Sequence, residues 1–230
     1  MLTPLRDSFS LNNLAYNQIK DAILTFKFLP NQALIEGDLA AQLGISKTPV
    51  RDALLQLEQD GLVERIAFKG TYVSGISNQD MANTYQIRIV LEGLAARMAA
   101  ELLSEADLVY LEDLIGEHEQ ALAQENFADA SRMNSDFHNH VIQQCGNPRL
   151  IRMLDFLDDN LKRYRLLSIA QGLRKEKSIV EHRDIFAALR SRDAVGAETC
   201  MHSHLNSAIN DLNDQNFEEL WHSLLKKRPE

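Results

Sequence analysis

The residues best suited to chemistry are histidines in the second half of the chain. Asn134 and His138 are four residues apart, so they share one face of a helix, and their apolar neighbours turn that face toward a core. His182 lies on a second apolar stripe, and a third segment contributes either His202 or His204, between which helical phase does not decide. Three imidazoles and one carbonyl oxygen that converge inside a helical bundle would suit Zn²⁺ or another divalent metal.

A second group of residues, near the start of the chain, has the types and spacing that contact nucleic acid. Residues 39–54 form two short amphipathic segments joined at Gly44, which is the pattern of a helix-turn-helix. Ser46 can cap the second helix and direct its backbone N–H groups toward a phosphate. These features predict a helix that enters the major groove of DNA.

The first turns of that second helix carry side chains suited to DNA contact. Lys47, Thr48 and Arg51 lie on adjacent faces of its start. Arg51 has the fork geometry that reads O6 and N7 of guanine, a contact worth about 1–3 kcal/mol of discrimination. An ordinary helical hairpin would also carry surface charges, but here they occur together with a turn and a following wing.

The segment after the hairpin predicts this wing. Residues 60–65 and 68–73 read as two short strands on either side of a tip at Lys69 and Gly70. Arg65 and Lys69 extend the basic face of the second helix. A local basic face of this kind is what contact with phosphates requires.

The histidines and the DNA-contacting residues must both be positioned by a chain that is mostly helical. We expect a first helix over about residues 11–28, then helices over 36–43 and 47–59 before the wing. Residues 75–78 read as a linker, in which Ser77 or Asn78 caps the next helix.

From residue 78 onward the sequence predicts six or seven helices and no convincing strand. Each break between helices carries a capping or turn residue. The breaks fall near residues 103–104, 125–126, 146–148, 172 and 192–193. We therefore expect a mainly α fold, with an N-terminal winged helix-turn-helix domain over residues 1–76 and a C-terminal all-α antiparallel helical bundle over residues 77–230.

Charge and composition agree with a two-part chain that binds DNA at one end. The net charge is −9, but residues 1–76 carry seven basic and eight acidic side chains, so the acidity belongs to the second half. No apolar run is long enough for a membrane span, and the start has no secretory pattern, which favours the cytoplasm. The two cysteines, Cys145 and Cys200, are expected to be reduced.

The first half resembles a known family. Residues 39–61, and above all the run from Ile45 to Leu54, are similar to the signature of the GntR family of bacterial transcriptional regulators. Gly37 stands where some members have a further DNA-contacting Arg, and position 47 is more commonly Arg. The resemblance implies that these residues approach DNA: Ser46, Lys47, Thr48, Arg51, Lys69 and Gly70.

The second half resembles the FCD ligand-binding domain of the FadR subgroup of these regulators, in residues 134–150, 181–183 and 201–205. In that domain an Asp or Asn and three His hold a metal, with Zn²⁺ favoured here and Ni²⁺ or another divalent ion also compatible. The implied ligands are Asn134, His138, His182 and His204. Only the family pattern selects His204. We assign the remaining histidines to the surface: His118, His140, His202 and His222.

Two properties of the ligand site follow from the resemblance. Asn134 stands where most members have Asp. A neutral amide is expected to weaken the binding of the metal or to change which metal the site prefers. Arg88 and Glu92 match an Arg-x-x-x-Glu spacing of the family. Arg88 can therefore bind an effector carboxylate in bidentate fashion, although a structural pair with Glu92 is an equally good reading.

The resulting hypothesis is a metabolite-responsive regulator, and its assignment as a repressor rests on the behaviour of similar proteins. It would bind a palindromic operator in double-stranded DNA as a homodimer, and a small carboxylate would enter the bundle. One alternative is a regulator whose metal is purely structural. Another is a metal-dependent enzyme, but the sequence fixes no acid or base beside an open metal position.

Overall fold

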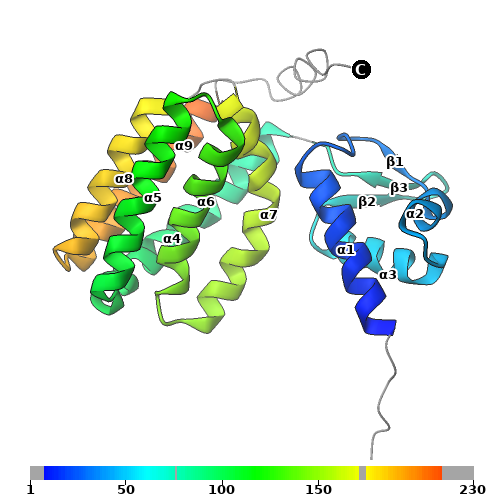
Figure 1. The fold of residues 1–230 in the computed structure, drawn as a ribbon, viewed down its shortest axis with the longest axis horizontal. Helices are drawn as coiled ribbons and strands as arrows, with labels where there is room; N and C mark the ends of the chain where they lie inside the picture. The colour runs from blue at the N-terminus through cyan, green and yellow to red at the C-terminus, as the bar shows by residue number, and fades with distance from the viewer. Residues whose placement is uncertain (1–7, 76, 171–174, 214–230) are drawn as a thin grey trace, which may run out of the picture. The chain divides into compact units, whose positions relative to one another are not determined.

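The computed structural model describes residues 8–75, 77–170 and 175–213. The chain divides into two compact units, Met1–Ile76 and Ser77–Glu230, which are described separately (Figure 1). The helix break predicted near Gly172 and the predicted surface position of His222 lie outside the described residues. None of the described helices is long and apolar enough to cross a membrane.

The first unit is a winged helix-turn-helix, as predicted. Its elements are α1 (Ser8–Leu24), β1 (Ala33–Leu34), α2 (Glu36–Leu43), α3 (Lys47–Gln59), β2 (Val63–Ile66) and β3 (Gly70–Val73). The turn between α2 and α3 depends on Gly44, whose φ of 66° is a left-handed conformation that glycine adopts without a steric penalty. The apolar faces of the three helices meet in one core, which includes Ile19, Ile23, Leu39, Val50 and Leu54.

The sheet of the wing has the order β1-β3-β2 and is antiparallel throughout. Val63 pairs with Val73 and Ile66 pairs with Gly70, so the hairpin turns between Ile66 and Gly70. The sequence did not predict β1, because a strand of two residues leaves too short a pattern to detect. The predicted first helix was too long at its end, since α1 stops at Leu24.

The second unit is an all-α bundle, also as predicted. Its described helices are α4 (Asn78–Leu102), α5 (Glu105–Ala123), α6 (Phe127–Gln143), α7 (Pro148–Ala170), α8 (Lys175–Arg190) and α9 (Ala194–Asn213). Three of them begin at a side chain that accepts a backbone N–H bond, namely Ser77, Ser104 and Asn126. These caps explain why the breaks could be read from the sequence.

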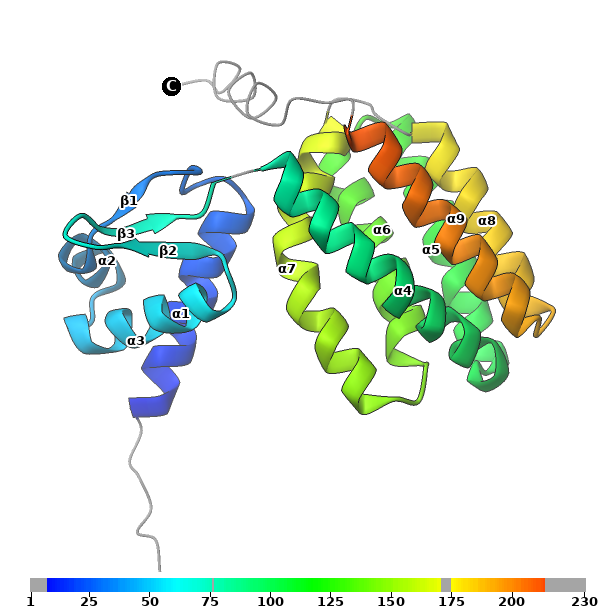
Figure 2. The same ribbon diagram turned by 180° about the vertical axis from the view of Figure 1, so that it is seen from behind.

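Helix α4 organises the bundle. It packs along α9 and also contacts α6, α7 and α8 (Figure 2). Alanines at the α4 interface, such as Ala96 and Ala99, are fully buried and allow a close approach of the helices. Gly93 is a point of close approach, because a Cβ there would clash with the ring of His202. Side chains on the inner faces of α4, α6, α7, α8 and α9 are thus brought to one place.

Candidate metal centre and DNA-binding surface

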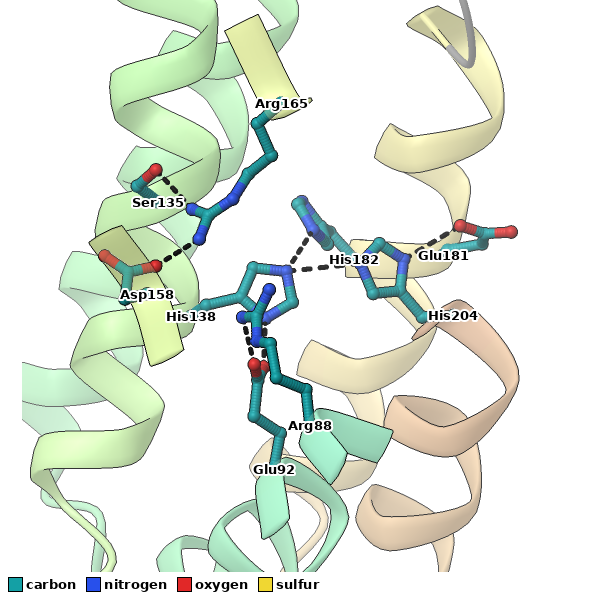
Figure 3. A network of polar contacts seen from close by, with 9 residues as sticks. All are labelled: Arg88, Glu92, Ser135, His138, Asp158, Arg165, Glu181, His182 and His204. Carbon is teal, nitrogen blue, oxygen red and sulfur yellow. Dashed lines mark hydrogen bonds and ion pairs between the residues drawn. The ribbon is translucent and has the colours of Figure 1, made fainter. Parts of the chain in front are cut away.

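Three histidines from three helices meet inside the bundle. They are His138 on α6, His182 on α8 and His204 on α9, and all three are buried (Figure 3). Nε2 of His138 lies 3.2 Å from Nε2 of His204 and 3.4 Å from Nε2 of His182. One nitrogen from each ring lies within 4.8 Å of the other two. We call these three residues the histidine triad.

Two carboxylates decide which ring nitrogen of His138 and of His204 faces the centre of the triad. Nδ1 of His138 lies 2.8 Å from Oε2 of Glu92, and Nδ1 of His204 lies 2.8 Å from Oε2 of Glu181. An ionised carboxylate only accepts, so Nδ1 carries the proton in each neutral ring and Nε2 presents a lone pair. Where both rings are neutral, the Nε2 lone pairs of His138 and His204 face each other across 3.2 Å, and a cation bound to both nitrogens would relieve their repulsion.

The two distances from Nε2 of His138 to the other rings of the triad are those of ligands around a small metal ion. Bonds of about 2.0–2.1 Å at tetrahedral angles would separate two ligand nitrogens by about 3.3–3.4 Å. Burial lowers the pKa of His138, against the opposite effect of Glu92, so this ring is neutral at pH 7 and its Nε2 can donate to a metal. The residues present therefore fit a divalent ion that prefers imidazole.

Glu92 links the triad to a buried arginine on the same helix. Burial raises the pKa of Glu92, but the charge of Arg88 and the contact with His138 outweigh it and lower the pKa to about 2. Arg88, one turn earlier on α4, forms an ion pair with Glu92, and both side chains are buried. The structural pair that the spacing allowed is present, and it sets the guanidinium group of Arg88 beside the partner of His138.

A second buried arginine lies on the other side of His138. Arg165 on α7 donates to Ser135 on α6 and forms an ion pair with Asp158, two turns earlier on the same face of α7 (Figure 3). The sequence analysis missed this group. The spacing of seven between Asp158 and Arg165 puts both on one helix face, but nothing in the sequence says that this face is buried.

The other predicted positions have mixed outcomes. Asn134 lies one turn before His138 on α6 and is half-buried, and its role as a ligand stays a prediction. His202 lies against Gly93 and outside the triad. His140 is partly exposed and bonds to Asp107.

The surface assignment of His118 is wrong. Its side chain on α5 is buried, with its ring centroid 5.6 Å from that of His182. Burial lowers the pKa of His118 to about 4, so it is neutral. Leu111, Ile115 and Leu122 lie on the same helical stripe, and this spacing was the signal that could have placed His118 inside.

In the first unit, the residues predicted to approach DNA lie on the outer face of α3. Ser46 holds the N-cap position, but its side chain makes no capping hydrogen bond. Lys47, Thr48 and Arg51 are exposed, while Val50, on the side of α3 that faces the core, is buried. The Arg51 guanidinium is bonded to Glu36 of α2, a partner that the sequence analysis did not identify.

The wing presents its tip to solvent. Lys69 and Gly70 are exposed, and Gly70 has a φ of 117° that favours glycine. Phe68 beside them is fully exposed. The basic residues of the tip and of α3 thus lie on exposed surfaces of one compact unit.

Comparison with known proteins decides the family. Residues 11–73 match the family model of bacterial regulatory proteins of the gntR family, and residues 83–207 match that of the FCD domain. The chain belongs to the GntR family. Its FCD domain agrees with the FadR subgroup that the sequence suggested, and its fold and relatives are those of DNA-binding transcriptional regulators rather than enzymes.

Similar GntR regulators cover most of the chain. It is 30% identical to an uncharacterised HTH-type transcriptional regulator, YdhC, from Bacillus subtilis (strain 168), over 83% of this chain and 86% of that one. It is 27% identical to the HTH-type transcriptional repressor RspR from Escherichia coli (strain K12), over 88% of this chain and 89% of that one. The solved structure of E. coli McbR/YncC is similar with a TM-score of 0.75 and 25% identity, over 88% of this chain and 97% of that one.

Proposed function

We propose that this GntR regulator is a repressor whose histidine triad holds a divalent metal and whose DNA affinity changes when a small carboxylate binds there. The observation that carries the proposal is the close approach of Nε2 of His138 to Nε2 of His204, with Nδ1 of each ring in contact with Glu92 or Glu181. Carboxylates that hold Nδ1 in this way are typical partners of metal-ligating histidines. When bound, the metal would supply a Lewis acid that attracts a carboxylate oxygen.

The ligands proposed for the metal are the triad and the side-chain oxygen of Asn134. Three imidazoles favour Zn²⁺, with Ni²⁺ or another divalent ion as alternatives. Glu92 and Glu181 orient two of the rings and keep their Nδ1 atoms protonated. A carboxylate effector would then add its oxygen at a remaining position of the metal.

Two buried arginines support an acidic effector. Arg88 and Arg165 both lie close enough to His138 for their charges to lower its pKa. Arg88 is the residue that we assign to the effector. To bind an incoming carboxylate it must share its guanidinium group with Glu92, which links effector binding to the orientation of His138.

DNA recognition is assigned to the first unit. Ser46, Lys47, Thr48 and Arg51 would contact the major groove, with Arg51 reading guanine, and Lys69 and Gly70 would follow the backbone. Two copies are needed to read a palindrome. We assign the homodimer contact to a groove of about 570 Å³ between α4 and α7, where Ile87, Met153 and Phe156 expose apolar side chains. As a bacterial regulator of this kind, the protein would act in the cytoplasm.

Repression is proposed because two similar proteins are named repressors. RspR and the E. coli GlaR, which is 26% identical over 84% of this chain and 92% of that one, are both named transcriptional repressors. The test is a thermal-shift screen of small mono-, di- and hydroxycarboxylic acids against metal-loaded and chelator-treated protein. We expect a subset of acids to stabilise only the metal-loaded protein and to lower its affinity for selected DNA.

One observation favours a second candidate, a purely structural metal. His138, His182 and His204 are at most 5% exposed, and closed sites are typical of structural metals. If no acid in the screen changes either the melting temperature or the DNA affinity of the metal-loaded protein, this second candidate replaces the first.

A further inference from the structure

Arg51 is bonded to an acidic residue of the neighbouring helix. Its Nε donates to Oε1 and Oε2 of Glu36 at 3.1 and 3.2 Å, and its Nη2 donates to Oε2 at 2.8 Å. Glu36 is the first residue of α2, and Arg51 lies in the second turn of α3. The pair therefore joins the two helices of the helix-turn-helix on its exposed side.

The bond occupies only one edge of the guanidinium group. Arginine has five N–H donors in a planar fork. Glu36 takes the Nε proton and one proton of Nη2, which leaves the two protons of Nη1 and one of Nη2 outside this bond. The open end of the fork presents parallel N–H groups from Nη1 and Nη2, which is the pair that matches O6 and N7 of guanine.

The charges around Glu36 show why it stays ionised at this surface. The bond with Arg51 lowers the pKa of Glu36, and the nearby charges of Arg65 and Lys47 lower it further. Yet the side chain of Arg51 is 56% exposed, and ion pairs at such positions add little to folding stability. The stability of the domain is thus a poor reason for the pair.

We propose that Glu36 is a positioning residue that holds the guanidinium plane of Arg51 for base reading and so sets operator specificity without contacting a base. The carboxylate fixes one edge of the fork and aims the other outward from α3. It also repels phosphates, so it opposes non-specific complexes in which Arg51 turns to the DNA backbone. The inference rests on the proposed role of Arg51 as the guanine reader.

The test uses the full chain and a duplex DNA library with a randomised centre, from which bound molecules are sequenced. The proteins are the wild type, Glu36→Gln, Arg51→Ala and the double variant. Asp38→Asn is the matched control, because Asp38 is an exposed acid in the same first turn of α2. Melting temperatures of all variants establish that each one is folded.

We expect Arg51→Ala to lose the preference for guanine at one position of the selected motif. Glu36→Gln should weaken the same preference about tenfold and leave other positions unchanged. Its affinity for a scrambled duplex should stay the same or rise, because a negative charge near the phosphates is gone. In the Arg51→Ala background, Glu36→Gln should change the motif no further, and Asp38→Asn should match the wild type.

Three results would overturn the inference in distinguishable ways. If Arg51→Ala loses the guanine preference while Glu36→Gln keeps it, Arg51 reads DNA without help from Glu36. If Arg51→Ala keeps the preference, the proposed reader itself is wrong, and the positioning role falls with it. An equal loss of preference in Asp38→Asn would mean that charge alone, rather than the bond to Arg51, is responsible.

Discussion

Nε2 of His138 faces Nε2 of His204 across 3.2 Å, while the opposite nitrogen of each ring is bonded to a glutamate at 2.8 Å. The glutamates come from α4 and α8, so four helices cooperate in this one contact. With both rings neutral, two lone pairs held face to face would destabilise an empty site and stabilise an occupied one. The metal should therefore contribute to the stability of the bundle.

Chelation should lower the melting temperature of the wild type. A metal at about a hundred times its Kd stabilises the fold by about 2.7 kcal/mol, which for a domain of this size is about 5–10 °C. Scanning calorimetry with and without a chelator measures the difference. His138→Ala, which removes one ligand, should melt at the same temperature in both conditions, and a matching shift in that variant would mean that the ion binds elsewhere.

Glu181→Gln should weaken metal binding without removing a ligand. The variant loses the carboxylate that holds Nδ1 of His204, and such losses reduce metal affinity about 10–100-fold. Competition with a coloured zinc chelator reports the affinity. Glu119→Gln is the control, because Glu119 pairs with Arg183 at the surface. If both variants bind zinc like the wild type, Glu181 does not orient a ligand.

Asp158→Asn should destabilise the bundle at neutral pH, because buried Arg165 then lacks its carboxylate. Breaking such a pair costs about 3–5 kcal/mol. Burial raises the pKa of Asp158, but Arg165, Arg88 and Lys162 outweigh it and hold the pKa well below its usual range. A carboxyl group whose pKa is lower in the folded state than in the unfolded state stabilises the fold. This stabilisation is fully present above the pKa of the unfolded state and is lost as the pH falls below that pKa.

The difference in the free energy of unfolding between Asp158→Asn and the wild type should therefore shrink in acid, by about 1 kcal/mol between pH 7 and pH 3. Urea unfolding at the two pH values measures it. Asp113→Asn, at an exposed position on α5, should differ from the wild type by less than about 0.5 kcal/mol at both. A constant difference for Asp158→Asn would show that Asp158 does not titrate as described.

Phe156→Glu should dissociate the proposed homodimer. Phe156 lines the groove between α4 and α7, and a two-fold contact would bury the new charge once in each copy. Sedimentation at about 10 μM should give a monomer for this variant, at a concentration where most specific dimers persist. Val109→Glu, on the exposed side of α5, should sediment like the wild type. A dimeric Phe156→Glu would place the interface elsewhere.

Local signals in the sequence were enough for the helix-turn-helix and for the helix breaks. Residues 36–43 and 47–59 were predicted as helices and are α2 and α3, because Gly44 and Ser46 mark the boundary between them. The breaks at Ser104 and Asn126 were readable for the same reason, since capping acts within one turn.

Contacts between distant helices could not be predicted in this way. The pairs Glu181–His204 and Glu36–Arg51 join residues 23 and 15 positions apart, and no periodicity relates them. His118 was misplaced because a single polar residue on an apolar stripe was given more weight than the stripe itself. Tertiary packing, rather than local spacing, decides such positions.

The metal content of the protein shows whether the histidine triad holds an ion. The full chain, purified without added metal and dialysed, is analysed by inductively coupled plasma mass spectrometry beside a variant with alanine at His138, His182 and His204. We predict about one divalent ion per wild-type chain and a near-complete loss of it in the folded variant. Equal metal content in the two proteins, or none in the wild type even after incubation with zinc, would contradict a metal centre at the triad.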